Sequence, residues 1–307
     1  MKAGDNMFKR LLINIKKHIS LLYFFGKDKA SSIMYQSPNV LSSEQTIEKI
    51  IKDKCSISRY GDGEFHLLIQ SKDLKFQKRS NELSRRLKNI LISDDEGLMV
   101  CIPNVFSESD LSMRTNESKK FWKDHVANYR LLWYKHLDRN KTYYNSTFTR
   151  NYIAIEDKSN LESYFDKVKK IWGNRDLLII EGEFSRLGVG NNLFDNANSI
   201  QRILAPSENA FEKYDLVLQK AKRHDKEKLV LIALGPTATI LSYDLHKLGY
   251  QAIDIGHLDV EFEWFLKKTK VRTKIENKYV IEANNRIEDD NHFFDAEYEK
   301  QIVDQVV

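Results

Sequence analysis

Two carboxylates stand one residue apart in residues 58–65, which read S-R-Y-G-D-G-E-F. They are Asp62 and Glu64, and Gly61 and Gly63 flank the first of them. A pair of acids with this spacing can bind a hard divalent cation and leave coordination positions for phosphate oxygens. The glycines let the backbone turn sharply and approach a ligand closely. The alternative is an ordinary surface turn, because turns favour the same residue types.

Three more polar loops follow predicted strands, at residues 181–192, 235–239 and 257–263. In an open parallel sheet the carboxyl ends of the strands face one crevice, where ligands bind. Together with residues 59–64, four polar loops would therefore converge on one place. That convergence indicates a site more strongly than any one loop does.

The turn Gly235-Pro236-Thr237-Ala238 joins a predicted strand to a predicted helix. A helix N-terminus offers unpaired N–H groups and partial positive charge, which suit a diphosphate. The turn has neither the lysine of a Walker A loop nor the G-x-G-x-x-G spacing. The alternative is a plain helix start in which Thr237 is the cap.

Glu183 and Arg186 lie beside a Gly-x-Gly sequence in the second polar loop. Arg186 could hold a phosphate with two parallel hydrogen bonds. An internal Arg–Glu pair that orders the loop is the alternative. For Arg150, in a polar segment near the middle of the chain, we expect a structural or solvated role rather than contact with a phosphate or sugar.

Residues 257–264 alternate polar and apolar side chains; the polar ones are His257, Asp259, Glu261 and Glu263. An extended segment would place all four on one face, whereas a helix would pair His257 with Glu261. We expect an extended segment or a bend at a helix start, because a helix would scatter Phe262 and Trp264. The cluster suits a general base or zinc ligands. It could also be the solvated face of a half-buried strand.

The elements that position these loops follow from apolar runs without alternation, at residues 97–103, 176–180, 229–234 and 251–255. Such runs are typical of buried parallel strands with helices on both faces of the sheet. Capping boxes at residues 42–45 and 159–162 predict helices at residues 47–54 and 161–172, and Ser207 predicts the cap of a helix that runs through about residue 223. Further helices are expected at residues 81–92, 115–137, 238–248 and 295–306, and a short strand at 279–283. We expect an α/β, Rossmann-like, mostly parallel domain over residues 41–307.

Residues 1–40 form a basic amphipathic extension in this prediction. Within it, residues 8–25 alternate apolar and basic side chains. They predict a helix that rests on an anionic membrane, a helix packed on the domain, or a disordered lead-in. No apolar run is long enough for a transmembrane helix, and no cleavage site of a signal peptide follows.

Net charge is +5 over 307 residues, and the usual nucleic-acid-binding motifs are absent, so no nucleic-acid partner is expected. The two cysteines, Cys55 and Cys101, stand in apolar runs and predict reduced core residues. That suits a cytoplasmic protein. Membrane association through residues 8–25 stays open.

Four motifs occur in a fixed order: R-Y-G-D-G-E-F, G-E-F-S-R-L-G-V-G-N-N-L-F-D-N-A, A-L-G-P-T-A-T and D-I-G-H-L-D-V-E-F-E-W. Over about residues 40–305 the chain resembles the bacterial GT-D glycosyltransferases, a family first catalogued as a domain of unknown function. The resemblance implies transfer of a sugar, often glucose, from a UDP-sugar with Mn²⁺ or Mg²⁺. The acceptor would be a glycan, lipid-linked or on protein, in surface-polysaccharide or adhesin-glycan synthesis.

The resemblance also implies residue roles. The D-x-E motif of the family falls on Asp62 and Glu64, which would bind the metal and the diphosphate. The remaining donor-binding positions would be Arg59, Gly61, Gly63, Glu183, Arg186, Gly235, Pro236, Thr237 and Ala238. The catalytic base is expected among His257, Asp259, Glu261 and Glu263.

Two other functions fit the same residues. One is a metal-dependent phosphoesterase or other hydrolase that uses the acidic loops. The other is an inactive accessory subunit of a glycosyltransferase complex.

Overall fold

The structure is a computed structural model of the chain, and it describes residues 26, 28–283 and 294–306. The chain forms two compact units. The small unit comprises residues 1–39 and 105–141, and the large unit residues 40–104 and 142–307. The sequence predicted no grouping of residues 105–141 with the N-terminal segment. The predicted helix at residues 8–25 lies outside the described residues.

The small unit contains the short helix α5 (Glu108–Leu111) and the long helix α6 (Asn116–His136). Thr115 caps α6 by accepting the N–H of Ser118, which confirms the helix predicted at 115–137. The guanidinium of Arg130 pairs with Asp28 and donates to the carbonyl of Phe106 at 2.8 Å. The α6 helix is therefore fixed inside its unit by a buried ion pair.

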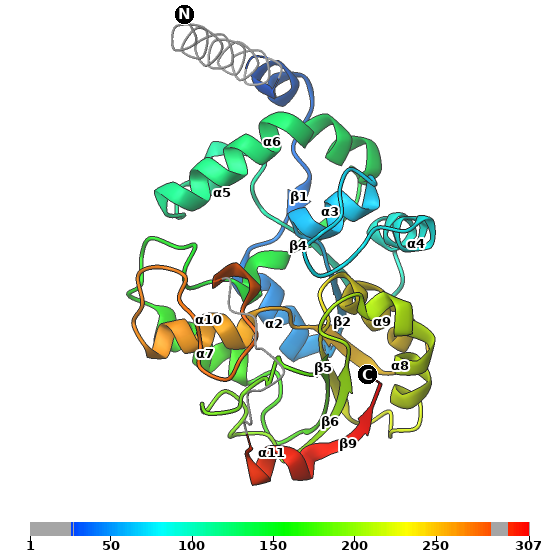
Figure 1. Cartoon of the computed structure of the whole chain (residues 1–307). Helices are drawn as coiled ribbons and strands as arrows, with labels where there is room; N and C mark the ends of the chain where they lie inside the picture. Colours follow the sequence, from blue (N-terminus) through cyan, green and yellow to red (C-terminus); the bar gives the residue numbers. More distant parts are fainter. Residues whose placement is uncertain (1–25, 27, 284–293, 307) are drawn as a thin grey trace, which may run out of the picture. The chain divides into compact units, whose positions relative to one another are not determined.

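A nine-stranded sheet has the order β1-β4-β3-β2-β8-β7-β5-β6-β9 (Figure 1). All pairings among β2 to β9 are parallel, which confirms the predicted α/β fold. The four strands predicted from apolar runs are all present. The strands are β1 (Asn39–Val40), β2 (Ser56–Arg59), β3 (Leu98–Ile102), β4 (Thr142–Asn145), β5 (Asp176–Gly182), β6 (Ser199–Ala205), β7 (Leu229–Ala233), β8 (Gln251–Asp254) and β9 (Ile302–Gln305).

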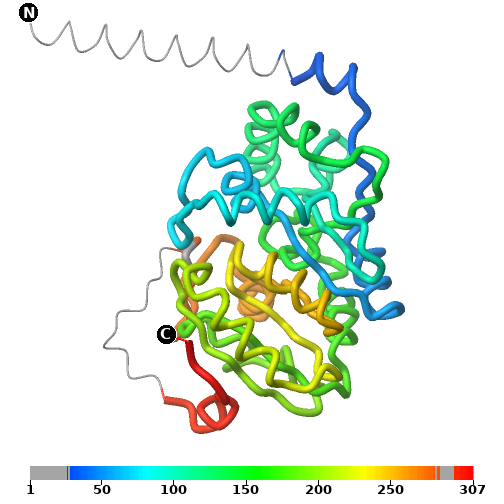
Figure 2. The backbone as a smooth tube through the Cα atoms, turned by 90° about the vertical axis from the view of Figure 1, so that its right-hand side faces the viewer, coloured from blue at the N-terminus to red at the C-terminus, as the bar shows by residue number. Residues whose placement is uncertain are grey.

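Helices cover both faces of the sheet in the large unit. On one face, α2 (Ser43–Asp53), α7 (Leu161–Lys169) and α10 (Leu258–Leu266) share a core with alternate strand residues. On the other face, α9 (Pro236–Lys247) packs on β2, β7 and β8, and α8 (Tyr214–Ala221) packs on β6. Figure 1 shows the two groups on opposite sides of the strands, and in Figure 2 the yellow trace of α9 faces the viewer. Buried core residues include Ile47, Ile57, Phe165, Ile179, Leu231, Ile253 and Trp264.

The helix starts agree with the prediction in part: one cap is confirmed, one cap is wrong and one helix begins later than predicted. The capping box at Ser42 is confirmed by two hydrogen bonds between Ser42 and Gln45. The box predicted at Ser159 is wrong, because Asn160 is the N-cap and the N–H of Ser159 is bound to the carboxylate of Asp157, but α7 begins at Leu161 as predicted and ends at Lys169. The helix predicted after Ser207 is delayed. The left-handed backbone of Asn209 is followed by the 3-10 turn η2 (Ala210–Lys213), and then by α8.

The C-terminal prediction is partly wrong. Residues 279–283 form no regular strand and end in the 3-10 turn η3 (Ile281–Ala283). The predicted helix at 295–306 is only α11 (Ala296–Gln301), and β9 follows it directly. The reason is tertiary, since Ile302–Gln305 pairs with β6 and extends the sheet. The helices α3 (Asp62–Leu68) and α4 (Asn81–Leu91) complete the fold.

Candidate functional site

The order of strands reverses between β2 and β8. From β2 the chain adds β3 and β4 toward one edge, whereas β8, β7, β5 and β6 lie toward the other. Open α/β sheets bind ligands outside the carboxyl ends of the strands at such a switch point. The acidic loop follows β2, and His257 follows β8, so both lie there.

The acidic loop ends β2 and begins α3 at Asp62. The N–H of Gly61 donates to Oε2 of Glu64 at 2.7 Å, so Glu64 caps its own helix. Burial, followed by the charge of Asp254, raises the pKa of Glu64. The half-buried carboxylate of Asp62 makes no hydrogen bond or ion pair with any described residue. Both carboxylate oxygens of Asp62 can therefore bind a ligand, whereas Glu64 has only one oxygen left for this.

The donor set limits which metal the loop could hold. Within the described ranges, no group of three or more His, Cys, Asp or Glu side chains is arranged for a metal ion. The loop offers Asp62 and one oxygen of Glu64. This set fits Mg²⁺-type binding, in which one or two carboxylates share the ion with substrate phosphates and water. It does not fit zinc, which takes three or four protein ligands.

Arg59 joins two strands rather than facing outward. Its Nε and Nη2 donate to the carbonyl and the carboxylate of Asp254 at 2.8 and 2.9 Å, and Nη1 reaches the carbonyl of Ser146 at 3.2 Å. Gly256 has φ +52°, and a Cβ there would lie 1.8 Å from Nη2 of Arg59. Arg59 therefore links the end of β2 to the end of β8 and to Ser146 at the switch point. Sequence reasoning missed Asp254, although an acid that ends an apolar strand is a signal for a buried ion pair.

Residues 258–266 form the helix α10, so the predicted extended segment is wrong. The argument against a helix fails because residues 258–264 of α10 are all buried, so its apolar residues need not share a face. Phe262 packs on Phe165 with ring centroids 5.1 Å apart, and Nε1 of Trp264 donates to Thr273. The helical alternative is confirmed, and it separates the four polar residues into two pairs.

The first pair, His257 and Glu261, faces the segment after β4. Nη2 of Arg150 lies 2.9 Å from Nδ1 of His257, and Oε2 of Glu261 accepts the N–H groups of Tyr152 and Ile153 at 2.9 Å each. Burial, then the charge of Arg150, lowers the pKa of His257 to about 4. Burial raises the pKa of Glu261, whose Oε1 is buried and finds no partner among the described residues.

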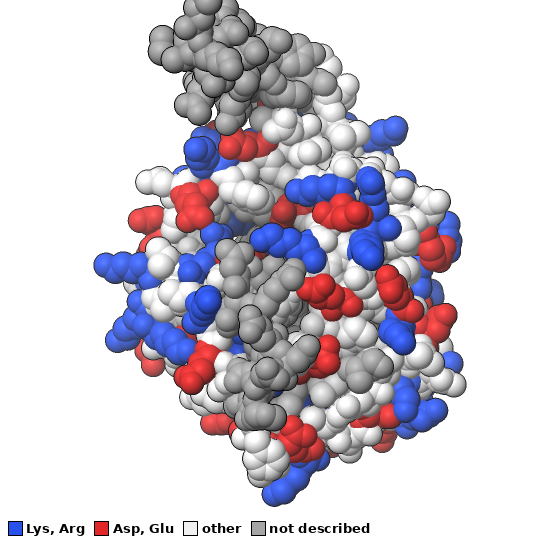
Figure 3. Space-filling model, in the orientation of Figure 1, with Lys and Arg blue, Asp and Glu red and all other residues white. Residues whose placement is uncertain are grey.

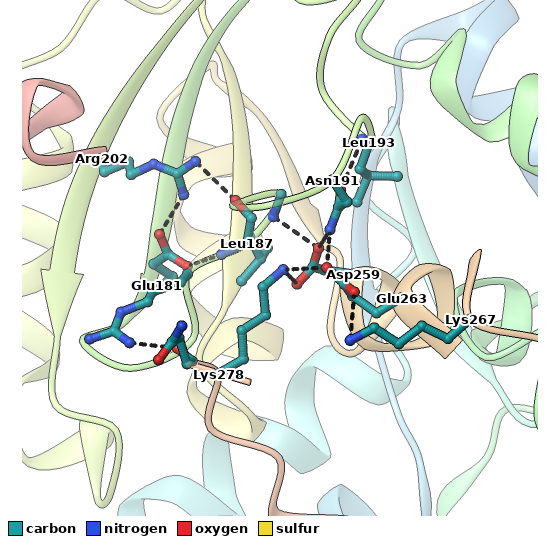
Figure 4. Close-up of polar contacts among 12 residues, drawn as sticks. Glu181, Leu187, Asn191, Leu193, Arg202, Asp259, Glu263, Lys267 and Lys278 are labelled. Atoms are coloured by element: carbon teal, nitrogen blue, oxygen red, sulfur yellow. Dashed lines mark hydrogen bonds and ion pairs between the residues drawn. The ribbon is translucent and has the colours of Figure 1, made fainter. Parts of the chain in front are cut away.

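The second pair, Asp259 and Glu263, lies in a buried network (Figure 4). Nζ of Lys278 is 2.7 Å from Oδ2 of Asp259 and 3.2 Å from Oε1 of Glu263. Nδ2 of Asn191 donates to both acids, and the N–H of Gly188 donates to Asp259 at 2.9 Å. These contacts bind the β5–β6 loop and the Lys278 segment to α10. No sequence signal pointed to Lys278.

The β5–β6 loop is ordered by Glu181, not by the predicted candidate Glu183. Glu181 pairs with Arg202 at 2.6 Å and accepts the N–H of Leu187 at 2.7 Å (Figure 4). Glu183 is half-buried, and its carboxylate contacts no polar group of the described residues. Arg186 is buried with φ +49°, and its Nη1 donates to the carbonyl of Asn277 at 2.5 Å. Arg186 therefore connects two loops.

The turn at Gly235 has φ +51°, and α9 begins at Pro236, two residues before its predicted start at Ala238. The N–H groups of Thr237 and Ala238 donate within the turn, to Leu234 and Gly235. The ring of Phe76 lies 2.6 Å from where a Cβ of Gly235 would stand, and the hydroxyl of Thr237 contacts Gln77. The turn thus offers a diphosphate fewer unpaired donors than the sequence suggested.

Arg150 has an acidic partner that the sequence did not reveal. Its Nη1 lies 2.6 Å from Oε1 of Glu282 in η3, and Nε of Arg272 is 3.5 Å from Oε2 of the same acid. Burial alone would raise the pKa of Glu282, but Arg150 and His257 bring it down to about 2. The sequence predicts a strand at residues 279–283, and that prediction assigns no role to the side chain of Glu282.

Comparison with known proteins identifies related chains. A family model described as "Glycosyltransferase GT-D fold" matches residues 57–283. A "Probable glycosyl transferase Gly" of Streptococcus gordonii and a "Glycosyltransferase GlyD" of Streptococcus pneumoniae serotype 4 are each 40% identical over 267 residues, or 86% of this chain. The chain spans 38% and 32% of the lengths of these two relatives.

Solved structures match the fold over nearly their full lengths. One, described as "The highly conserved domain of unknown function 1792 has a distinct glycosyltransferase fold", has a TM-score of 0.84 at 37% identity and covers 91% of this chain and 99% of its own. Another, "A New Glycosyltransferase (DUF1792) from Streptococcus sanguinis", has a TM-score of 0.82 at 37% identity and covers 88% and 100%.

Proposed function

Because the chain belongs to the family of glycosyltransferases with the GT-D fold, we propose that it transfers glucose from UDP-glucose to a glycan acceptor in surface-polysaccharide or glycoprotein synthesis. The observation that carries this proposal is the carboxylate of Asp62. It lies at the switch point of the sheet, and none of the described residues binds it. An acid left unpaired at a ligand-binding edge suits a metal-bound diphosphate.

We propose Mn²⁺ or Mg²⁺ as the cofactor, held by Asp62 and by Glu64 through the oxygen that does not cap α3. When bound, such an ion would neutralise charge on the diphosphate as UDP leaves. Glu64 keeps the loop in register through its bond to Gly61, and Arg59 keeps β2 against β8.

We place the catalytic base on the face of α10 that carries His257 and Glu261. What supports this choice is the state of the other two candidates, since Asp259 and Glu263 are already bound by Lys278 and Asn191. A general base needs an oxygen or nitrogen within reach of the acceptor hydroxyl. The side chain of His257 is 30% exposed, and Glu261 has a raised pKa and an oxygen without a described partner.

We also propose that the acceptor is lipid-linked or on a protein, and that residues 8–25 touch an anionic membrane from the cytoplasmic side. What supports the membrane contact is the mixture of basic and apolar side chains in that segment. None of the described helices has the length and apolar character needed to cross a bilayer.

A binding experiment tests the function. The full chain is titrated with UDP and UDP-sugars in the calorimeter, with Mn²⁺, with Mg²⁺ and with EDTA. We expect metal-dependent binding of UDP and UDP-glucose. Asp62→Asn should weaken it at least about tenfold, the order of one charged interaction. The melting midpoint without ligand should not fall, because Asp62 has no described partner.

Asp53→Asn is the matched control, since Lys49 is the one described residue with which Asp53 forms an ion pair, on the exposed surface at the end of α2. It should bind UDP as the wild type does. Acceptor-independent release of glucose or phosphate would instead favour the hydrolase. Absence of nucleotide binding with any metal would favour the accessory subunit.

A further inference from the structure

We infer that Arg150 is the guanidinium that binds the diphosphate of the sugar donor, and that Glu282 orients it for this role. The inference rests on the proposed function, and it assigns to Arg150 a contact that the sequence favoured for Arg59 and Arg186. It follows from where Arg150 lies in the sheet and from which of its donors are used.

The position of Arg150 follows from the strand order β4-β3-β2-β8. Arg150 comes at the end of the 3-10 turn η1 (Ser146–Thr149), directly after β4, whereas His257 comes after β8. Their 2.9 Å contact therefore spans the carboxyl ends of β3 and β2. The bond from Arg59, the last residue of β2, to the carbonyl of Ser146 also holds η1 at this place. The acidic loop also follows the carboxyl end of β2. Arg150 and Asp62 therefore lie at the same edge of the sheet, the one formed by the carboxyl ends of the strands.

The other two arginines, Arg59 and Arg186, already donate hydrogen bonds to protein groups. All three nitrogens of the Arg59 guanidinium donate to Asp254 or Ser146, and Arg186 is buried and bound to Asn277. The side chain of Arg150 is 34% exposed. A guanidinium has five N–H groups, and Arg150 uses one toward His257 and one toward Glu282. The other three make no hydrogen bond within the described part of the chain.

The surrounding charges keep Arg150 cationic and in place. Burial opposes its charge, but Glu282, Glu261 and Asp62 together raise its pKa. Glu282 also contacts Arg272, so the acid is held from a second side. A planar guanidinium fixed by a carboxylate, with donors left over, binds phosphate oxygens with defined geometry.

The test compares ligands with and without phosphate. Binding of UDP to the full chain with Mn²⁺ is measured by calorimetry, and binding of uridine by ligand-observed NMR. Arg150→Gln should weaken UDP about tenfold or more and leave uridine unchanged. Arg150→Lys should fall between, because it keeps the charge but loses the planar fork. Arg85→Gln is the control, since Arg85 also loses an ion pair, with Glu82 on the exposed face of α4, and should bind UDP like the wild type.

Arg150→Gln leaves the half-buried Glu282 without its nearest cation, so the unfolding of every variant is measured without ligand. Combining Arg150→Gln with Glu282→Gln removes both charges together, and this variant should show the same selective loss for UDP. Wild-type UDP affinity in both variants would overturn the inference. An equal loss for UDP and uridine would also overturn it, because it would indicate a distorted site. A wild type that binds no nucleotide would instead refute the proposed function.

Discussion

Asp62 and Asp259 are both acids in the first turn of a helix that follows a parallel strand, yet their surroundings differ completely. Asp259 is buried and bound by Lys278, Asn191 and Gly188. Asp62 is half-buried with no partner among the described residues. A saturated acid holds the structure together, whereas an unsaturated one can bind a ligand. Residue type alone therefore does not distinguish the two roles.

At the scale of single residues, the lowered pKa of His257 predicts how the stability of the fold depends on pH. Its pKa in the folded chain is about 4, below the ordinary value of 6.5, so the unfolded chain takes up a proton first as the pH falls. Stability should therefore decrease from about pH 6.5 to pH 4 because of this group. In His257→Gln that decrease should be shallower, by up to about 1.4 kcal/mol per pH unit.

Urea unfolding at a series of pH values checks this prediction. His66, which is buried, and His224 and His246, which are half-buried, also have pKa values lowered by burial, and they contribute equally to wild type and variant. Glu282, with a pKa of about 2, acts in the separate window from about pH 4.5 downward, where stability is lost as the carboxylate is protonated. Parallel curves for wild type and variant between pH 6.5 and 4 would contradict the assignment to His257.

At the scale of elements, α10 decides the role of its polar residues. A helical period separates residues 257 and 261 from residues 259 and 263, so one face meets the segment after β4 and the other meets the β5–β6 loop. One helix thus carries a candidate catalytic face and a structural face. The alternating pattern of the sequence could not reveal this division, because it fits an extended segment equally well.

The structural face of α10 gives a stability prediction. Lys278→Met should lower the free energy of unfolding by about 3–5 kcal/mol, because it removes the buried cation that Asp259 and Glu263 share and leaves buried Asp259 without a cation. Lys267→Met is the matched control. Lys267 also pairs with Glu263, at 3.4 Å, but its side chain is 47% exposed, so its loss should cost about 0–1 kcal/mol. Denaturant unfolding of both variants measures the difference, and equal losses would show that burial does not matter here.

At the scale of the whole molecule, every candidate site residue belongs to the large unit. On the face shown in Figure 3, the described lysines and arginines are interspersed with acids. A mixed surface of this kind favours a protein that binds its ligand at a local site, rather than one that binds a polyanion over a broad basic area.

The location of the candidate site residues in the large unit predicts the effect of deleting the N-terminal segment. A chain that lacks residues 1–25 should bind UDP with wild-type affinity, because no donor-binding candidate lies in that segment. It should also lose binding to vesicles with anionic lipid if that segment contacts the membrane. Calorimetry and vesicle flotation measure the two effects, with neutral vesicles as the control. A large loss of UDP affinity would contradict the assignment of the donor site to the large unit.

The parallel sheet, the polar loops at four strand ends and the capped start of α2 could all be predicted from sequence patterns. These features depend on neighbours within a few residues, since apolar runs, turn residues and caps act locally. For the same reason, the D-x-E spacing and its place after β2 could be predicted. Local predictions were wrong where a competing contact intervened: the cap at Ser159, whose N–H is bound by Asp157, and the C-terminal helix, which ends where β9 pairs with β6.

Which polar residues are already paired became visible only in the folded chain. Arg59 and Asp254 are 195 residues apart in the chain, Arg150 and Glu282 are 132 apart, and Asp259 meets Gly188 across 71 residues. A buried charge must find a partner, but nothing in the local sequence names a partner so far away. The physical reason is that charge pairing depends on distance in space, whereas sequence patterns report only distance along the chain.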